Sequence, residues 1–334
     1  SYVFPSTNYS LFAQHIFQLT PRLEITPGVR LEHISTQAEG EYREVVKDIA
    51  GNVIFDSLYA DVRTNSRNLL IAGVAVDYKL AKSHRVYVNF TQNYRSINFT
   101  DMQIQNPNFR IDPNLQDEKG FNADLGFQGS KNGKLYYDVS FFLLAYNNRI
   151  GTTIEVDPTL FNTYQYRTNI SASVTKGVEA FVEYDVWKAL VGDSSKASLR
   201  VFVNASFLDA RYINSEVAAF ENKKVELVPP FTLKAGVKYA YKGFVAAYQF
   251  SYTHEHFSDA TNSFSQGNAV NGLIPSYWTS DVSFKYSIKR FQFGAGVNNV
   301  MDQSYFTRRA SGYPGPGIIP ASPRNGYVSL QVKL

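Results

Sequence analysis

Alternation of apolar and polar residues recurs along this chain from end to end, and sustained helical periodicity is hard to find. Residues 121–128, 231–241 and 277–288 are clear examples, each with apolar residues at alternate positions along most of its length. Successive side chains of a β-strand point to opposite faces, so each such segment has one apolar and one polar face. The pattern therefore predicts an all-β protein.

About thirteen strands are predicted from this alternation. They lie at residues 8–20, 22–39, 66–80, 83–97, 118–129, 134–150, 167–187, 196–211, 230–241, 243–257, 275–287, 290–300 and 325–334. Their connections alternate between short turns and segments of about 15 to 25 residues, as in transmembrane barrels, which have short periplasmic turns and long extracellular loops. A soluble β-sandwich shares the alternation but has no reason to sort its loops. We therefore expect a transmembrane antiparallel β-barrel of the outer membrane.

Composition narrows the choice of function. Aromatic residues make up 15% of the chain and charged residues 19%, which fits a surface that partly faces lipid. No stretch approaches the length of apolar sequence that a transmembrane helix needs. The absence of cysteine excludes disulfides and thiolate metal sites, and we expect no covalently bound cofactor. The net charge is only +4 and no basic run occurs, so nucleic acid is not an expected partner.

Several segments carry a resemblance to a known family. Gly296-Val-Asn-Asn-Val-Met-Asp-Gln-Ser-Tyr-Phe306 is similar to a segment before the last loop of TonB-dependent outer-membrane receptors. Asn93-Tyr-Arg-Ser96 and Asn114-Leu-Gln-Asp-Glu-Lys-Gly120 resemble two further segments of that family, and so does Lys176-Gly-Val-Glu179 after Tyr166-Arg-Thr-Asn169. The loop that ends Tyr313-Pro-Gly-Pro-Gly-Ile-Ile-Pro320 resembles the ferric-dicitrate type.

The resemblance implies a barrel of 22 strands with an N-terminal plug inside it. We therefore expect residues 1–334 to be the C-terminal portion of such a barrel, with about 13 of 22 strands and without the plug. Because thirteen is odd, the first and last strands would be parallel neighbours in a closed ring, which single-chain bacterial barrels do not form. This predicts truncation on the N-terminal side.

The resemblance also implies a function and partners. The protein is expected to be a receptor in the outer membrane of a Gram-negative bacterium that captures ferric citrate or a ferric siderophore at its extracellular loops. The ferric chelate is then the transported ligand. The TonB–ExbB–ExbD complex would supply energy through the plug, and lipopolysaccharide and membrane lipid would surround the barrel. Another nutrient such as cobalamin or an oligosaccharide, a passive porin and a barrel enzyme are the alternatives.

Arginine and aromatic residues on the long-loop side are the candidate ligand contacts, since guanidinium groups bind carboxylates in bidentate fashion. The residues chosen are Arg308, Arg309, Tyr313, Arg324, Arg95, Arg149 and Arg167. Other basic or aromatic residues on this side are Arg110, Tyr164, Tyr166 and Arg211. The alternative for each arginine is that it binds lipopolysaccharide phosphate or an acidic neighbour in the loops.

Metal binding and catalysis have little support. His254 and His256 share one face of a strand, but two ligands without a third are weak evidence for a metal site. The five histidines are otherwise scattered, and no Gly-x-Ser-x-Gly motif is present. We therefore expect no enzymatic activity.

Overall fold

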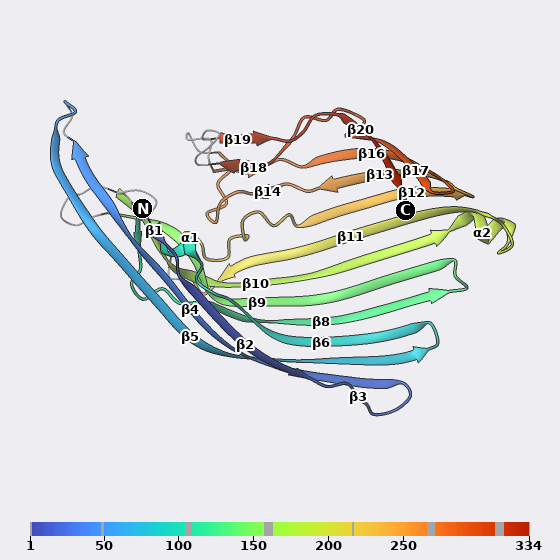
Figure 1. Ribbon diagram of the computed structural model, residues 1–334, viewed down its shortest axis with the longest axis horizontal. Coiled ribbons are helices and arrows are strands. Elements are labelled where there is room, and N and C mark those ends of the chain that lie inside the picture. Colours follow the sequence, from blue (N-terminus) through green and yellow to red (C-terminus); the bar gives the residue numbers. More distant parts are fainter. Residues whose placement is uncertain are drawn as a thin grey trace.

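The computed structural model describes residues 2–47, 50–103, 109–156, 163–215, 217–265, 271–310 and 317–333. Nearly all of this is β-structure, and most strands belong to one large antiparallel sheet (Figure 1). No helix in the described part of the chain is long and apolar enough to cross a membrane.

The strands of this sheet follow one another in chain order. They are β1 (Tyr2–Val3), β4 (Leu23–Lys47), β5 (Val53–Ala81), β6 (His84–Arg95), β8 (Glu118–Lys131), β9 (Leu135–Val156), β10 (Thr163–Asp185), β11 (Ala197–Ile213), β12 (Phe231–Tyr241), β13 (Phe244–Thr253), β16 (Tyr277–Ile288), β17 (Phe291–Asn298) and β20 (Asn325–Val332). β2 (Ser6–Gln14) and β3 (Phe17–Gln18) also pair with β4, so β1, β2 and β3 form one interrupted strand.

The all-β antiparallel prediction is confirmed, and so are all thirteen predicted strands. The predicted facing ends of the sixth and seventh strands are too short, because β9 runs on to Val156 and β10 starts at Thr163. Those of the second and third strands are also wrong, because β4 runs on to Lys47 and β5 starts at Val53. The expected loop between them is a two-stranded ribbon. Cross-strand contacts stabilise it: the rings of Tyr42 and Tyr59 stack at 5.3 Å, and Arg43 Nε donates to Asp56 at 2.6 Å.

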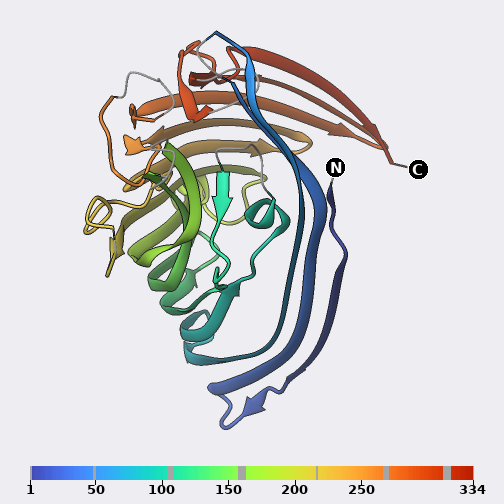
Figure 2. The same ribbon diagram turned by 90° about the vertical axis from the view of Figure 1, so that its left-hand side faces the viewer.

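The sheet is strongly curved (Figure 2). Its concave face carries the polar half of each alternating strand. There, Arg85 donates to Asp77 at 3.0 Å, and Asp138 accepts from Tyr87 at 3.2 Å and Gln128 at 3.1 Å. The convex face carries the exposed apolar half. In a membrane this arrangement places apolar side chains against lipid and polar ones in the interior.

Smaller elements lie in the connections. They are α1 (Phe99–Met102), β7 (Phe109–Ile111), α2 (Val186–Val191), β14 (His256–Phe257), β15 (Leu273–Ile274), β18 (Phe306–Ala310) and β19 (Gly317–Pro320). β14 pairs with β15, and β18 pairs with β19, as two small hairpins. Among the described residues, β20 and the interrupted strand β1–β3 do not pair with each other, so each leaves one edge of the sheet open.

Candidate functional site

The connection between β6 and β8 folds onto the concave face, at the long-loop end of the sheet (Figure 2). β7 pairs in parallel with Gln165–Arg167 of β10, while α1 contacts β4. In the sheet, β4 and β10 are separated by β5, β6, β8 and β9. We therefore call residues 96–103 and 109–117 the crossing segment, because it spans the curve of six strands.

A reciprocal cap begins α1. Asn98 Oδ1 accepts from the backbone N–H of Asp101 at 3.0 Å, and Asp101 Oδ2 accepts from the backbone N–H of Asn98 at 3.0 Å. Such a capping box satisfies donors that the start of a helix leaves open. It also fixes the carboxylate of Asp101, which is 0% exposed.

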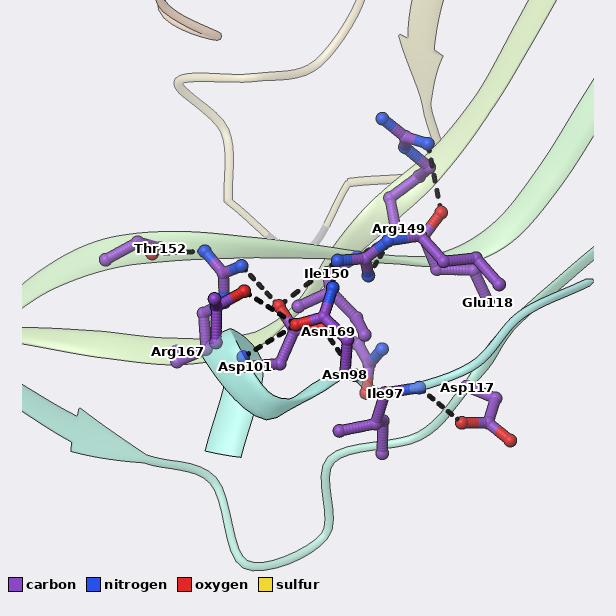
Figure 3. Close-up of polar contacts among 12 residues, drawn as sticks. Ile97, Asn98, Asp101, Asp117, Glu118, Arg149, Ile150, Thr152, Arg167 and Asn169 are labelled. Carbon is purple, nitrogen blue, oxygen red and sulfur yellow. Dashed lines mark hydrogen bonds and ion pairs between the residues drawn. The ribbon is translucent and has the colours of Figure 1, made fainter. Parts of the chain in front are cut away.

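Asp101 forms ion pairs with two guanidinium groups, those of Arg95 and Arg167; Figure 3 labels Asp101 and Arg167. Arg95 of β6 donates to both carboxylate oxygens, at 2.9 and 3.2 Å, and Arg167 of β10 donates to one of them. Burial raises the pKa of Asp101. The hydrogen bond from Arg167, the backbone N–H of Asn98 and the charges of both arginines outweigh this, so the pKa stays below its ordinary value. Asp101 is therefore ionised near neutral pH and ties α1 to two strands.

Glu118, the first residue of β8, makes a second junction. It is 2% exposed, and it accepts from Arg95 at 3.1 Å, from Arg149 of β9 at 2.9 Å and from the backbone N–H of Ile150 at 3.1 Å. Arg95 thus bridges Asp101 and Glu118. The carboxylate links three neighbouring strands directly beside the crossing segment.

Asp117 makes a third junction, which closes the two ends of the crossing segment on each other. It accepts from the backbone N–H of Ile97 at 2.8 Å, and Arg67 Nε of β5 lies 2.8 Å from its other oxygen. Arg67 also donates to the carbonyl of Ile97 at 3.2 Å. On the far side, Asn169 exchanges two hydrogen bonds with the backbone of Gln116, at 2.8 and 3.0 Å.

Four arginines share the three buried carboxylates, which leaves one positive charge in excess. Apolar contacts support the same segment, because Ile97, Met102, Ile111 and Leu115 form a buried cluster with Ala38 of β4. A cavity of about 560 Å³ remains between these side chains and β5. The crossing segment is thus fixed by charge on one side and by apolar packing on the other.

Three of the seven predicted contact residues, Arg95, Arg149 and Arg167, come together in this network. Each is paired with an acidic neighbour, which is the alternative that the sequence left open. Sequence reasoning missed their partners. Asp117 and Glu118 do lie in the segment 114–120 that resembles the receptors, and Arg95 lies in the segment 93–96, but a long connection separates the two segments. Nothing local predicted that they would meet.

Arg308 and Arg309 lie in β18 and differ in their surroundings. Arg309 donates to the carbonyl of Leu273 in β15 at 3.0 Å, and its guanidinium lies 5.2 Å from the ring centre of Phe306. It therefore joins the two small hairpins. Arg308 is exposed. Because Arg308 and Arg309 are consecutive residues of one strand, their side chains point to opposite sides. Its guanidinium has no hydrogen bond or ion pair with another described residue.

The remaining candidates are dispersed. Arg324 holds the turn before β20 in place. Its backbone N–H donates to Asp302 at 2.8 Å, and its side chain donates to the carbonyl of Val300 at 3.2 Å. Tyr313 lies outside the described residues. Arg110 lies 4.1 Å from the ring centre of Tyr164.

The further basic and histidine residues do not extend the network. Arg211 donates to Asp209 at 2.9 Å. His256 contacts the carbonyl of His254 at 3.0 Å through Nδ1. The described part of the chain contains no group of three or more His, Cys, Asp or Glu residues that could hold a metal ion.

Comparison with solved structures supports the fold. The ferric citrate transporter FecA in its unliganded form matches with a TM-score of 0.73 at 18% identity, over 98% of this chain and 45% of that one. The ferric-catecholate import receptor Fiu from E. coli K12 matches at 0.72 and 14%, over 99% and 45%. The ferric yersiniabactin uptake receptor FyuA from Yersinia pestis matches at 0.72 and 16%, over 99% and 46%. The chain therefore spans about half the length of these structures.

No curated protein sequence matches the chain. The family described as "TonB dependent receptor-like, beta-barrel" matches residues 1–300, which is most of its length. The match includes the crossing segment and all strands up to β17. This chain belongs to the TonB-dependent receptor β-barrel family.

Proposed function

We propose that the receptor containing this chain captures an anionic ferric chelate, either ferric citrate or a ferric siderophore, for import across the outer membrane. Family membership supports a TonB-energised transporter in the outer membrane of a Gram-negative bacterium. The similar structures whose names give a ligand include importers of ferric citrate, ferric catecholate and ferric yersiniabactin, but also a copper transporter. These are transport proteins and receptors, not enzymes.

The observation that carries the choice of an anionic ligand is the exposed guanidinium of Arg308. It stands on a hairpin that Arg309 holds against its neighbour, so the cation is presented from a fixed support. Iron chelates of citrate and catecholate are anionic, and their carboxylate or catecholate oxygens accept hydrogen bonds from guanidinium.

Transport would then follow the order expected of such a receptor. The extracellular loops bind the chelate, and the TonB–ExbB–ExbD complex, acting through a plug domain, opens a path along the polar concave face. The ferric chelate is cargo in this scheme. Lipopolysaccharide and phospholipid would contact the convex face. Uptake should therefore stop in cells that lack TonB or whose inner membrane is de-energised.

Uptake of radioactive iron by cells that produce the receptor tests the proposal. Arg308→Gln should weaken binding of ferric citrate roughly tenfold or more, because a hydrogen bond to a charged group contributes about 1.5–3 kcal/mol. Arg308→Lys should restore part of the loss. For comparison, uptake of a neutral ferric hydroxamate chelate and uptake of copper are measured in the same cells. Equal affinity of the wild type and Arg308→Gln for every anionic chelate tested would remove the assignment, and saturable copper uptake alone would favour copper as cargo.

A further inference from the structure

One short connection at the other end of the sheet contains a helix. α2 joins β10 to β11, at the end opposite the crossing segment (right in Figure 1). Asp185 caps its start, since its side chain accepts from the backbone N–H of Lys188 at 3.1 Å and from the hydroxyl of Ser198 at 2.7 Å. Gly192 ends it with φ +104°, which glycine adopts without strain. The helix is therefore fixed at both ends.

The exposed side of α2 is apolar. Trp187, Leu190 and Val191 are spaced by three and four residues, so they share one face of the helix. Their exposed fractions are 37%, 81% and 59%. The indole N–H of Trp187 donates to Ser195 Oγ at 2.9 Å, so the polar atom of the ring is satisfied within the turn. What remains exposed is hydrocarbon, which is unfavourable in water.

The apolar convex surface reaches the end of the sheet at which α2 lies. In β11, Ala197 belongs to the same face as Val201 and Val203, which are exposed on the convex side. Ala197 itself is only 6% exposed, and α2 contacts β11. α2 therefore lies at the end of the sheet where apolar residues of the convex face, such as the paired Tyr184 and Val201, border it. Tyr184, just before the helix, is exposed on the same side.

Lysine residues lie in and beside α2. Lys188 lies within the helix. Lys134 of the adjacent turn is already paired with Asp193 at 3.3 Å, so Lys188 is the ammonium offered to a headgroup. Tryptophan and lysine together are characteristic of the boundary between acyl chains and headgroups, where the ring is half-buried and the ammonium reaches phosphate. The short connections of a barrel in this family face the periplasm, so the adjoining lipid is the inner, phospholipid leaflet.

We propose that α2 is an interfacial anchor, with Trp187, Leu190 and Val191 inserted among the acyl chains of the inner leaflet of the outer membrane. Its partner is phospholipid. The anchor fixes the depth of the barrel on the β10–β11 side and is independent of which ligand the receptor carries.

Tryptophan fluorescence gives the first test, since Trp187 and Trp278 are the only tryptophans in the chain. The receptor is reconstituted into phosphatidylcholine vesicles with Trp278 and any tryptophan outside this chain replaced by phenylalanine. Emission from Trp187 should be shifted to short wavelength, lose most of its intensity when the lipid is brominated in the upper acyl chain, and resist aqueous iodide. Quenching by iodide with no response to brominated lipid would overturn the anchor. Shielding from both quenchers would indicate a protein partner and would also overturn it.

Spin labelling gives an independent test, because the chain has no cysteine. A nitroxide at Leu190→Cys should collide more often with oxygen than with a water-soluble nickel chelate. A nitroxide at Ser194→Cys, four residues on and outside the apolar face, is the matched control and should show the reverse. Retention of heat-dependent gel mobility would verify that both variants are folded. Equal access of the nickel chelate to both sites would contradict the proposal, and the fluorescence test does not depend on either variant.

Discussion

Replacing Asp101 by asparagine should loosen the crossing segment while leaving the sheet intact. Removing one partner from a buried ion pair costs about 3–5 kcal/mol, because the other charge is left unpaired. Two contacts reduce this cost here: Arg95 keeps its pair with Glu118, and Arg167 keeps its hydrogen bond to Thr152 at 3.1 Å. Asparagine also retains one acceptor. We therefore expect a loss of about 2 kcal/mol, or a roughly thirtyfold rise in local opening.

Hydrogen exchange followed by mass spectrometry measures this opening in the receptor held in detergent or nanodiscs. Peptides from the crossing segment should exchange faster in Asp101→Asn. Peptides from β12 should not change, because β11 separates β12 from β10, the nearest strand of the network. Asp193→Asn is the matched control. Asp193 is exposed and has a single partner, Lys134, so its ion pair contributes little. Unchanged exchange of the crossing segment in Asp101→Asn would refute the reasoning.

The same measurement should depend on pH in one direction. The folded protein holds the pKa of Asp101 below its ordinary value of about 3.9, so the contribution of this carboxylate is fully present above that pH. It is lost as the pH falls through the lower value of the folded state. Protection of the crossing segment, corrected for intrinsic exchange, should therefore be constant from neutral pH to about 5 and fall below about 4. The pH dependence of protection that is present in the wild type and absent in Asp101→Asn is caused by the titration of Asp101.

Three further substitutions test other parts of the structure. Arg309→Gln should release the two small hairpins, β14–β15 and β18–β19, and speed their cleavage by protease, whereas Arg308→Gln should not. Equal cleavage of the two variants would show that the contact of Arg309 with Leu273 does not hold the hairpins together. Gly120→Ala should lower thermal stability by about 1–3 kcal/mol, because a Cβ there would lie 1.8 Å from the carbonyl oxygen of Ala145, whereas Gly28→Ala, with its nearest atom at 3.8 Å, should be close to neutral. Leu125→Arg should reduce the free energy of folding into vesicles by about 2–4 kcal/mol, because Leu125 is exposed on the convex face. Asn122→Arg on the concave face should reduce it less, and equal reductions would contradict the assignment of faces.

The strands could be predicted because each is specified by its own residues. In residues 231–241 the apolar positions recur with period two, and a shift of one residue would turn Lys234 and Lys238 to the convex face. The ribbon of β4 and β5 was missed beyond residue 39. Its stability comes from cross-strand pairs such as Tyr42 with Tyr59, which are not visible until the register is known.

The candidate site was only half predictable for a related reason. Arginine on the long-loop side could be selected from the sequence, since strand direction follows from the order of short and long connections. The sequence did not reveal that Arg95 and Arg167 both converge on Asp101. That carboxylate lies in a long connection with little local pattern, and the capping box at Asn98 and Asp101 is a weak signal by itself.

The sequence by itself determined the class of fold, the number and direction of the strands, the face that each side chain occupies and the family resemblance. These follow from period-two alternation and turn spacing, which act between near neighbours along the chain. Only the tertiary structure decided which arginines are paired and which is exposed. Ion pairs such as Arg167 with Asp101 join residues 66 positions apart, and the pairing depends on how a connecting segment folds back across six strands. No local preference encodes that path.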